Sequence, residues 1–139
     1  MIRFHFITNT TLKNRNRLKL FITENAKKER CHIESIDIIF CSDQFLLDIN
    51  RRHLNHNFLT DIITFDLTHK SNKGKTAEIY ISIDRVKENA QLFSFSFNQE
   101  LHRVIFHGIL HLCGYKDKKP GEVKMMRKME DVWLDHYFR

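Results

Sequence analysis

The sequence predicts a small sheet covered by helices, in the α+β or α/β class. Four short runs rich in β-branched and aromatic residues are separated by longer stretches whose apolar residues recur with helical spacing. These signals follow one another in mixed order, which is typical of a sheet packed by helices. The chain has 139 residues, of which 42% are hydrophobic, and no linker-like stretch divides it. We therefore expect one domain that spans residues 1–139.

Four runs have the composition of strands. The first alternates apolar side chains with Arg3 and His5, whereas the second is an almost unbroken β-branched run, as expected for a strand buried on both faces. The last two are separated by a polar stretch, 69–76, that we expect to be a loop. The predicted strands are residues 2–6, 33–40, 61–67 and 77–83.

Five helices are predicted from capping residues followed by apolar residues at helical spacing. The candidate caps of the first four are, in chain order, Asn9-Thr10-Thr11, Ser42 or Asp43, Asp84, and Ser96 with Gln99. Pro120-Gly121 is expected to be a turn before the fifth helix. The predicted apolar faces of the second and fifth helices are Leu47, Asn50 and Leu54, and Met125, Met129, Val132 and Trp133.

The fourth helix carries the main functional signal, His107-x-x-x-His111 followed by Gly114 and Asp117. A four-residue step places two imidazoles on one helix face, about one turn apart, where they can bind one metal ion. Gly114 favours the left-handed conformation that ends a helix, so Asp117 can turn back to the same ion. An isolated H-x-x-x-H is more often two ordinary histidines on a helix flank, but the glycine and the carboxylate favour a metal site.

Asp117 is the predicted third ligand, and three ligands leave zinc the open position that distinguishes catalytic from structural sites. Glu122 competes for this role if the turn before it is tight, whereas Lys116 is a poor ligand because it must first lose a proton. A carboxylate ligand also favours harder metals, so we expect one Zn²⁺ per chain or another divalent ion in its place. Gly108 stands where H-E-x-x-H proteases have their glutamate, which makes peptide hydrolysis a weaker hypothesis.

The charge balance indicates a polyanionic partner. Lys and Arg outnumber Asp and Glu by 23 to 17, a formal charge of +6. Nucleic acid is the usual partner of such a chain, although a solvated basic surface gives the same count. We find neither a signal peptide nor an apolar run near the roughly 20 residues that span a bilayer. We therefore expect a cytoplasmic protein with no membrane segment, and we assume a monomer.

Three segments together resemble the YbeY family. His107 to Tyr115 reads H-G-I-L-H-L-C-G-Y and matches that family's H-G-x-L-H-L-x-G-Y signature at every fixed position. Residues 60–65 resemble its T-D-V-L-S-F strand, and residues 78–82 resemble its G-D-I-x-I-S strand. The order and spacing of the three segments agree with the family, and with the chain length they cover nearly the whole sequence.

The resemblance implies a metal-dependent endoribonuclease that cuts single-stranded RNA during ribosomal RNA maturation, with zinc held by three residues of the motif. It also implies a mixed four-stranded sheet, so the expected fold is α+β, with about five helices and a central metal-binding helix. Single-stranded or ribosomal RNA is the expected partner, with the ribosome or its proteins as further candidates. An RNA- or ribosome-binding protein with a non-catalytic metal, or a zinc hydrolase of another substrate such as peptide, remains the alternative.

Two positions depart from the family pattern. The family's third ligand is a histidine where this chain has Asp117, and its second helix carries an arginine where this chain has Leu54. Arg52 is our candidate for a replacement catalytic cation, with Arg51 beside it, although on a helix neither shares the direction of position 54.

The remaining candidate residues surround the motif in sequence or belong to the family's strands. His107 and His111 are expected to act in catalysis through the metal. Thr60 and Asp61 either line the site and hydrogen-bond to a ligand histidine, or are turn residues. The candidate RNA-binding cations, each equally well explained as a solvated surface residue, are Arg51, Arg52, Lys116 and Lys118.

Overall fold

Four strands form one mixed sheet. The computed structural model describes residues 1–56 and 59–139. Its strands are β1 (Ile2–Phe6), β2 (Ile33–Cys41), β3 (Ile62–Asp66) and β4 (Lys75–Ser82), each within two residues of its predicted ends. They lie in the order β1-β2-β4-β3, with the first three parallel and β3 antiparallel to β4. This arrangement confirms the expected α+β fold.

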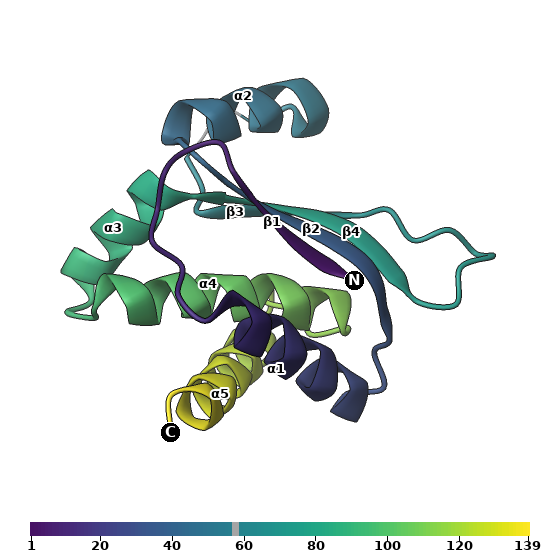
Figure 1. The fold of residues 1–139 in the computed structure, drawn as a ribbon. Coiled ribbons are helices and arrows are strands. Elements are labelled where there is room, and N and C mark those ends of the chain that lie inside the picture. Colours follow the sequence, from purple (N-terminus) through teal and green to yellow (C-terminus); the bar gives the residue numbers. More distant parts are fainter. Residues whose placement is uncertain (57–58) are drawn as a thin grey trace.

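In the described part of the chain, five helices cover the sheet. They are α1 (Arg15–Lys28), α2 (Asp43–Leu54), α3 (Ile83–Leu92), α4 (Phe97–Leu112) and α5 (Pro120–Tyr137). Figure 1 shows α2 against one face of the sheet and α4 against the other, with α1 and α5 beyond α4. Among the described residues, no helix has both the length and the apolar character needed to cross a bilayer.

The helix that carries the histidine motif is packed on two opposite sides. A Cβ at Gly108 would lie 2.8 Å from the Cδ1 of Ile62, so this glycine allows α4 to approach β3 closely. On the opposite side, the ring of Phe106 packs against Phe21 of α1 and Trp133 of α5, with centroids 5.4 and 5.5 Å away. The expectation of a central helix is confirmed.

Serine side chains begin three of the helices. The hydroxyls of Ser42, Ser82 and Ser96 each accept a hydrogen bond from the backbone N–H three residues later, at 3.2, 3.2 and 3.0 Å. Ser42 and Ser96 were predicted, but the prediction of Asp84 for α3 is wrong. β4 runs directly into α3, so Ser82 already holds the cap position, and Asp84 accepts the N–H of Asp43 at 2.8 Å.

The first helix begins later than predicted. Asn9-Thr10-Thr11 does not cap it, because α1 begins at Arg15. After β1 the chain stays bound to β2, since the N–H groups of Ile7 and Thr8 both donate to the carbonyl of Phe40 at 3.0 Å. The polar residues that resembled a cap therefore lie in a connecting segment.

The fifth helix begins earlier than predicted, because Pro120-Gly121 forms its first turn instead of a turn before it. A proline at the first helical position gives up no hydrogen bond, since that N–H has no partner inside a helix. The Glu122 carboxylate accepts the backbone N–H of Lys119 at 2.9 Å. Glu122 therefore caps α5 and does not fold back toward the motif.

Two predicted apolar faces are partly displaced: Asn50 of α2 and Trp133 of α5 are buried as predicted, but other members of these faces are not. Met126 is buried on α5 while Met125 is 47% exposed, and Leu46 is buried on α2 while Leu47 is half-buried. Leu54, predicted on the same face as Asn50, is 39% exposed. One residue rotates a helix by about 100°, so sequence spacing alone did not fix which side of α2 meets the sheet or which side of α5 meets α4.

Candidate metal centre

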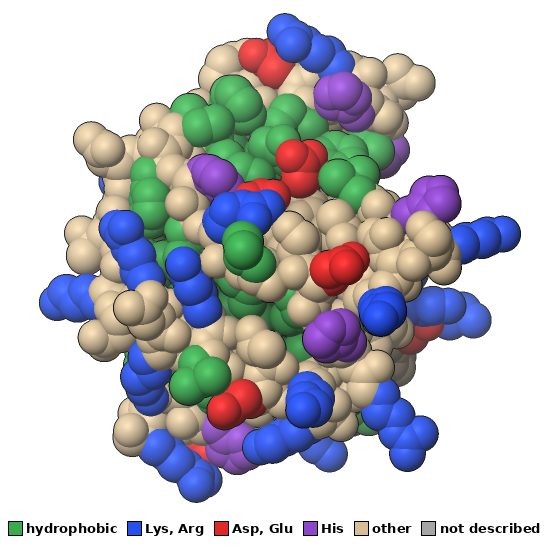
Figure 2. Space-filling model, turned by 45° about the vertical axis from the view of Figure 1, so that its right-hand side comes forward, with side chains coloured by type: hydrophobic (Ala, Val, Ile, Leu, Met, Phe, Trp, Pro, Cys, Tyr) green, Lys and Arg blue, Asp and Glu red, His purple; other side chains and the backbone are tan. Residues whose placement is uncertain are grey.

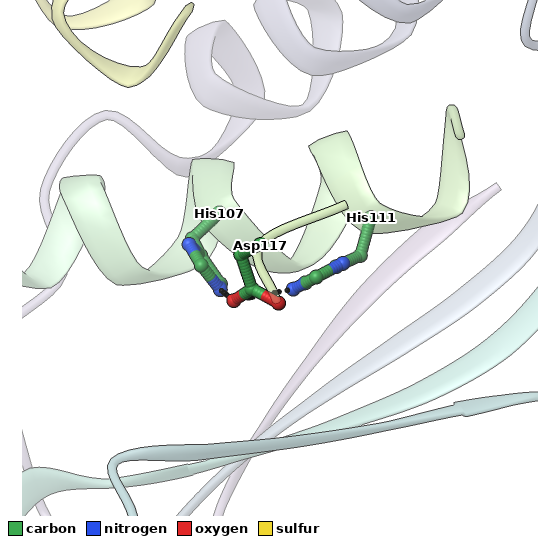
Figure 3. A group of neighbouring side chains, drawn as sticks. All are labelled: His107, His111 and Asp117. Atoms are coloured by element: carbon green, nitrogen blue, oxygen red, sulfur yellow. Dashed lines mark hydrogen bonds and ion pairs between the residues drawn. The ribbon is translucent and has the colours of Figure 1, made fainter. Parts of the chain in front are cut away.

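Two histidines interrupt the buried part of α4. From residue 100 to residue 112 all residues of this helix are buried except His107 and His111, which are half-buried. Their ring centroids lie 4.6 Å apart. Figure 3 shows both rings on one side of the helix, each with a nitrogen directed at Asp117. The structure therefore brings together the three residues that the motif pointed to.

Asp117 reaches the histidines because the chain turns back after α4. Gly114 has a φ of 103°, which strains any residue with a side chain, and the N–H of Tyr115 donates to the carbonyl of Leu110 at 3.0 Å. The Tyr115 hydroxyl also donates to the Glu29 carboxylate at 2.9 Å. The loop that presents Asp117 is thus anchored to the end of α4 and to the residue that follows α1.

The three side chains have the spacing of metal ligands. One oxygen of Asp117, Oδ2, lies 3.3 Å from Nε2 of His107 and 3.2 Å from Nε2 of His111. Donors about 2.0–2.1 Å from a tetrahedral ion are separated by about 3.3 Å. All three donor atoms lie within 4.8 Å of one another. The residues therefore fit a divalent ion, and three donors leave one position of a tetrahedral ion open.

Glu130 of α5, which the sequence did not single out, lies behind His107. Its Oε2 is 2.6 Å from His107 Nδ1, and the residue is 5% exposed. A carboxylate acceptor keeps the proton on Nδ1, so the Nε2 lone pair faces Asp117. Burial works to lower the pKa of His107, but the hydrogen bond and the charge of Glu130 outweigh it and raise the pKa.

Arg103 neutralises the buried carboxylate. Its guanidinium lies 3.2 Å from Glu130 and 2.9 Å from Asp131, and its Nε is 3.6 Å from Glu100. Burial raises the pKa of Glu100, and the positive charge of Arg103 opposes that change. Sequence reasoning missed both Arg103 and Glu130, although one signal existed: each is a charged residue inside an apolar helix face.

The two predicted residues just before β3 also border the histidines. Burial raises the pKa of Asp61, and the positive charge of His107 opposes the shift, so these two groups lie within electrostatic range. The Asn89 amide donates to Asp61 Oδ2 at 3.4 Å. The Thr60 hydroxyl donates to the carbonyl of Ile62 at 3.3 Å, which makes it part of the local turn as well as of the site wall.

Two hollows meet at two of the three donors, His107 and Asp117. One of about 450 Å³ runs along β3, where Thr60 and Thr64 form part of its wall. The other, of about 290 Å³, lies between the α3–α4 turn and α5. Asp61, His107 and Asp117 border both hollows. A divalent ion held by these residues would therefore have space beside His107 and Asp117.

The predicted RNA-binding cations fall into two places. Lys116 and Lys118 are exposed on either side of Asp117, next to the donors. Arg51 and Arg52 are exposed near the end of α2, across the sheet from α4, so the structure does not bring them to the histidines. Figure 2 shows Lys and Arg side chains spread over the visible face instead of gathered in one patch. Arg52 as a catalytic cation remains a prediction.

Comparison with known proteins identifies the family. Residues 6–138 match the family model described as Endoribonuclease YbeY. A protein of that name from Cytophaga hutchinsonii is 49% identical over 128 residues, which cover 91% of this chain and 88% of the relative. Another from Karelsulcia muelleri is 42% identical over 134 residues, which cover 96% and 94%. A solution structure of a Thermotoga maritima protein aligns with a TM-score of 0.66 at 29% identity, over 99% of this chain and 89% of that one. This chain belongs to the YbeY family.

Proposed function

We propose that this protein is a metal-dependent endoribonuclease that cuts single-stranded RNA at the His107, His111 and Asp117 cluster. One observation carries the proposal: in a chain of this family, three donors spaced for one divalent ion line one hollow, and two of them, His107 and Asp117, also line a second. Zinc is the proposed ion, and the Asp117 carboxylate also suits a harder divalent metal. We place this activity in the cytoplasm, in ribosomal RNA maturation, with the ribosome as a further partner.

The side chains of the site have separable roles. When bound, a divalent ion supplies a Lewis acid that polarises a phosphoryl oxygen and acidifies water. Glu130 holds the Nδ1 proton of His107, so this imidazole offers Nε2 without rearrangement. Asp117 contributes a negative charge, which reduces the net positive charge of the loaded site compared with three neutral imidazoles.

The hollow along β3 is the proposed path of the RNA backbone. It opens at the three donors and carries Thr64, whose hydroxyl is able to donate to a phosphate or ribose oxygen. It also carries Thr60, whose hydroxyl proton is directed at the carbonyl of Ile62 and whose oxygen is able to accept from a ribose hydroxyl. Lys116 and Lys118 flank the donors on the exposed loop, where their charges attract neighbouring phosphates. A single strand placed there brings one phosphate to the cluster.

The deciding experiment measures metal and cleavage on the same purified protein. We expect about one divalent ion per chain, cleavage of a labelled single-stranded RNA, and little cleavage of duplex RNA or single-stranded DNA. Chelation should abolish cleavage, and added zinc or manganese should restore it. Binding should weaken as salt rises, because phosphate contacts release counterions. Intact RNA beside cleaved peptides would favour a different hydrolase, and binding without cleavage would favour a structural metal.

A further inference from the structure

The hollow between the α3–α4 turn and α5 differs in character from the hollow along β3. Beside the residues it shares with the metal site, it has an apolar wall contributed by three elements, formed by Phe93, Val104, Val123 and Met126. Its volume of about 290 Å³ is close to the lower end of the roughly 300–1,000 Å³ typical of small-molecule pockets. An apolar recess that opens onto a metal site is suited to the part of a substrate that carries no charge.

Phe93 is exposed but held in place. Phe93 is 56% exposed, although its backbone is fixed at the C-cap of α3, where its N–H donates to the carbonyl of Asn89 at 3.0 Å. The next residue, Ser94, has a φ of 59°, and the N–H of Phe95 donates to the carbonyl of Ala90 at 2.9 Å. Because this backbone is already fixed, only the two side-chain torsions of Phe93 lose freedom when another flat ring packs on it.

The charges of this hollow argue against a phosphate as its occupant. Its cations are Arg103 and Arg127, and both are paired with the buried Glu130 carboxylate, at 3.2 and 3.4 Å. Carboxylates outnumber these cations, because Asp61, Glu100 and Asp117 also contribute to the lining. A neutral flat group avoids this repulsion, and the Asn89 amide on the same wall offers both a donor and an acceptor to its edge.

We infer that this hollow is a nucleobase subsite, in which Phe93 stacks on the base of a nucleotide adjacent to the phosphate at the metal centre. The inference rests on the proposed ribonuclease function and extends it, because it separates the path of the backbone along β3 from the position of a base beside α5. Stacking on an aromatic face tolerates any base, so the subsite explains a requirement for unpaired RNA and imposes little sequence preference. In a duplex the base is stacked and paired, and cannot enter.

The first test replaces Phe93. Phe93→Ala should raise the KM for single-stranded RNA about five- to hundredfold, the effect of losing one base–aromatic stack. The value of kcat should stay within about twofold, because the ring does not touch the reacting phosphate. Bound metal per chain should not change. Phe93→Trp should retain the wild-type KM, and Phe93→Leu should behave more like Phe93→Ala.

The chain offers a matched control. Phe138 is also the residue that ends a helix, is 45% exposed, and borders a hollow that His107 does not reach. Phe138→Ala should leave KM unchanged. A Phe93→Ala enzyme whose KM equals those of the wild type and of Phe138→Ala would overturn the subsite.

The second test removes the base instead of the ring. An RNA with one abasic nucleotide beside the cleaved bond should weaken binding to the wild type and cause no further loss in Phe93→Ala, because the same contact is already absent. If the abasic nucleotide and Phe93→Ala each weaken binding and their losses of affinity add, the base lies elsewhere and the inference is overturned. If the wild type cleaves no RNA, the proposed function fails separately, and affinities for the same oligonucleotides decide the subsite. Equal affinity of wild type and Phe93→Ala for the intact strand would then reject it.

Discussion

The two histidines of the cluster occupy the same helix but differ in what supports them. His107 has the buried Glu130 carboxylate 2.6 Å behind its Nδ1, and Arg103 holds that carboxylate in turn. His111 is more exposed, and its Nε2 lies 3.2 Å from the loop residue Asp117. One half of the site is therefore built by helix packing, and the other half depends on a short loop.

The largest expected effect comes from the loop half. Asp117→Asn replaces a charged ligand by a neutral amide that binds divalent ions poorly, so bound metal per chain should fall to near zero. The fold should persist, because the Asp117 side chain is 36% exposed and belongs to no packed element. Metal analysis after dialysis, with a thermal melt of the metal-free protein beside it, measures both effects.

Two further variants test whether the loss of metal in Asp117→Asn identifies Asp117 as the third ligand. Asp117→His should keep metal, because zinc accepts imidazole at nearly the same distance as carboxylate. Glu122→Gln should also keep metal, because Glu122 caps α5. Full occupancy in Asp117→Asn together with loss in Glu122→Gln would contradict Asp117 as the third ligand.

The next effect tests the half of the site built by packing. Glu130→Gln retains the shape of the side chain and removes the charge that orients His107, so metal affinity should fall about 10- to 100-fold. Titration with a chelator of known affinity measures the change. Asp131→Asn is the matched control, because Asp131 also pairs with Arg103, at 2.9 Å, but is 59% exposed at its side chain and does not contact His107.

If Asp131→Asn weakens metal binding as much as Glu130→Gln, the effect comes from disturbing Arg103 and not from orienting His107. A nitrogen-15 NMR spectrum of the metal-free protein provides an independent measurement. The wild type should show the His107 proton on Nδ1, and Glu130→Gln should show a mixture of tautomers.

The same contrast explains how far the sequence could predict the site. His107, His111 and Asp117 were recognised because they lie close together along the chain, where helical spacing and one glycine determine their geometry. Glu130 lies 23 residues from His107 and meets it only because α5 packs across α4. No local pattern encodes that crossing. Its one trace in the sequence was a charge within an apolar face.

The fold shows the same limit. The strand runs were located within two residues because β-branched composition is a local property. The errors arose where another element decided the outcome. The polar residues after β1 remain bound to β2 and do not start a helix. Pro120 is a different case, because its missing N–H costs nothing at the first position of α5, where the sequence suggested a turn. Leu54 was placed on one face with Leu47 and Asn50 from spacing alone, but Asn50 is buried and Leu54 is 39% exposed.

A third histidine on α4, His102, is fully buried, in contrast to the half-buried His107 and His111. His102 is 2% exposed, its Nδ1 lies 2.7 Å from the carbonyl of Asn98, and its ring stacks on Tyr137. Burial lowers the pKa of His102 below its ordinary value of 6.5. The unfolded chain therefore binds a proton that the folded protein resists. The free energy of unfolding should fall as pH drops below about 6.5, by at most about 1.4 kcal/mol per pH unit.

Chemical denaturation between pH 7.5 and pH 5 measures this slope, and His102→Phe should flatten it while keeping a ring against Tyr137. His107, whose pKa is raised, adds stability as pH falls toward 6.5, so the slope below that value is compared with that of His102→Phe. Asp37 acts lower on the pH scale. Hydrogen bonding to Arg3 lowers the pKa of Asp37 from 3.8 to about 2, so its stabilising contribution is lost only as pH falls through that lower range. An equal slope in wild type and His102→Phe would mean that His102 is not the group responsible.

The smallest expected effect concerns Leu54, where the family has an arginine. Because Leu54 is 39% exposed at the end of α2, Leu54→Arg should not bury a charge, and the melting temperature and metal content should stay close to wild type. Within the described chain, Leu54 borders neither hollow beside the donors, and α2 lies across the sheet from α4. The added charge should therefore tighten RNA binding only about twofold at low salt, with no gain at high salt and no change in kcat. A rise in kcat that persists at high salt would show that a guanidinium at position 54 reaches the reacting phosphate, and would place the end of α2 within the active site.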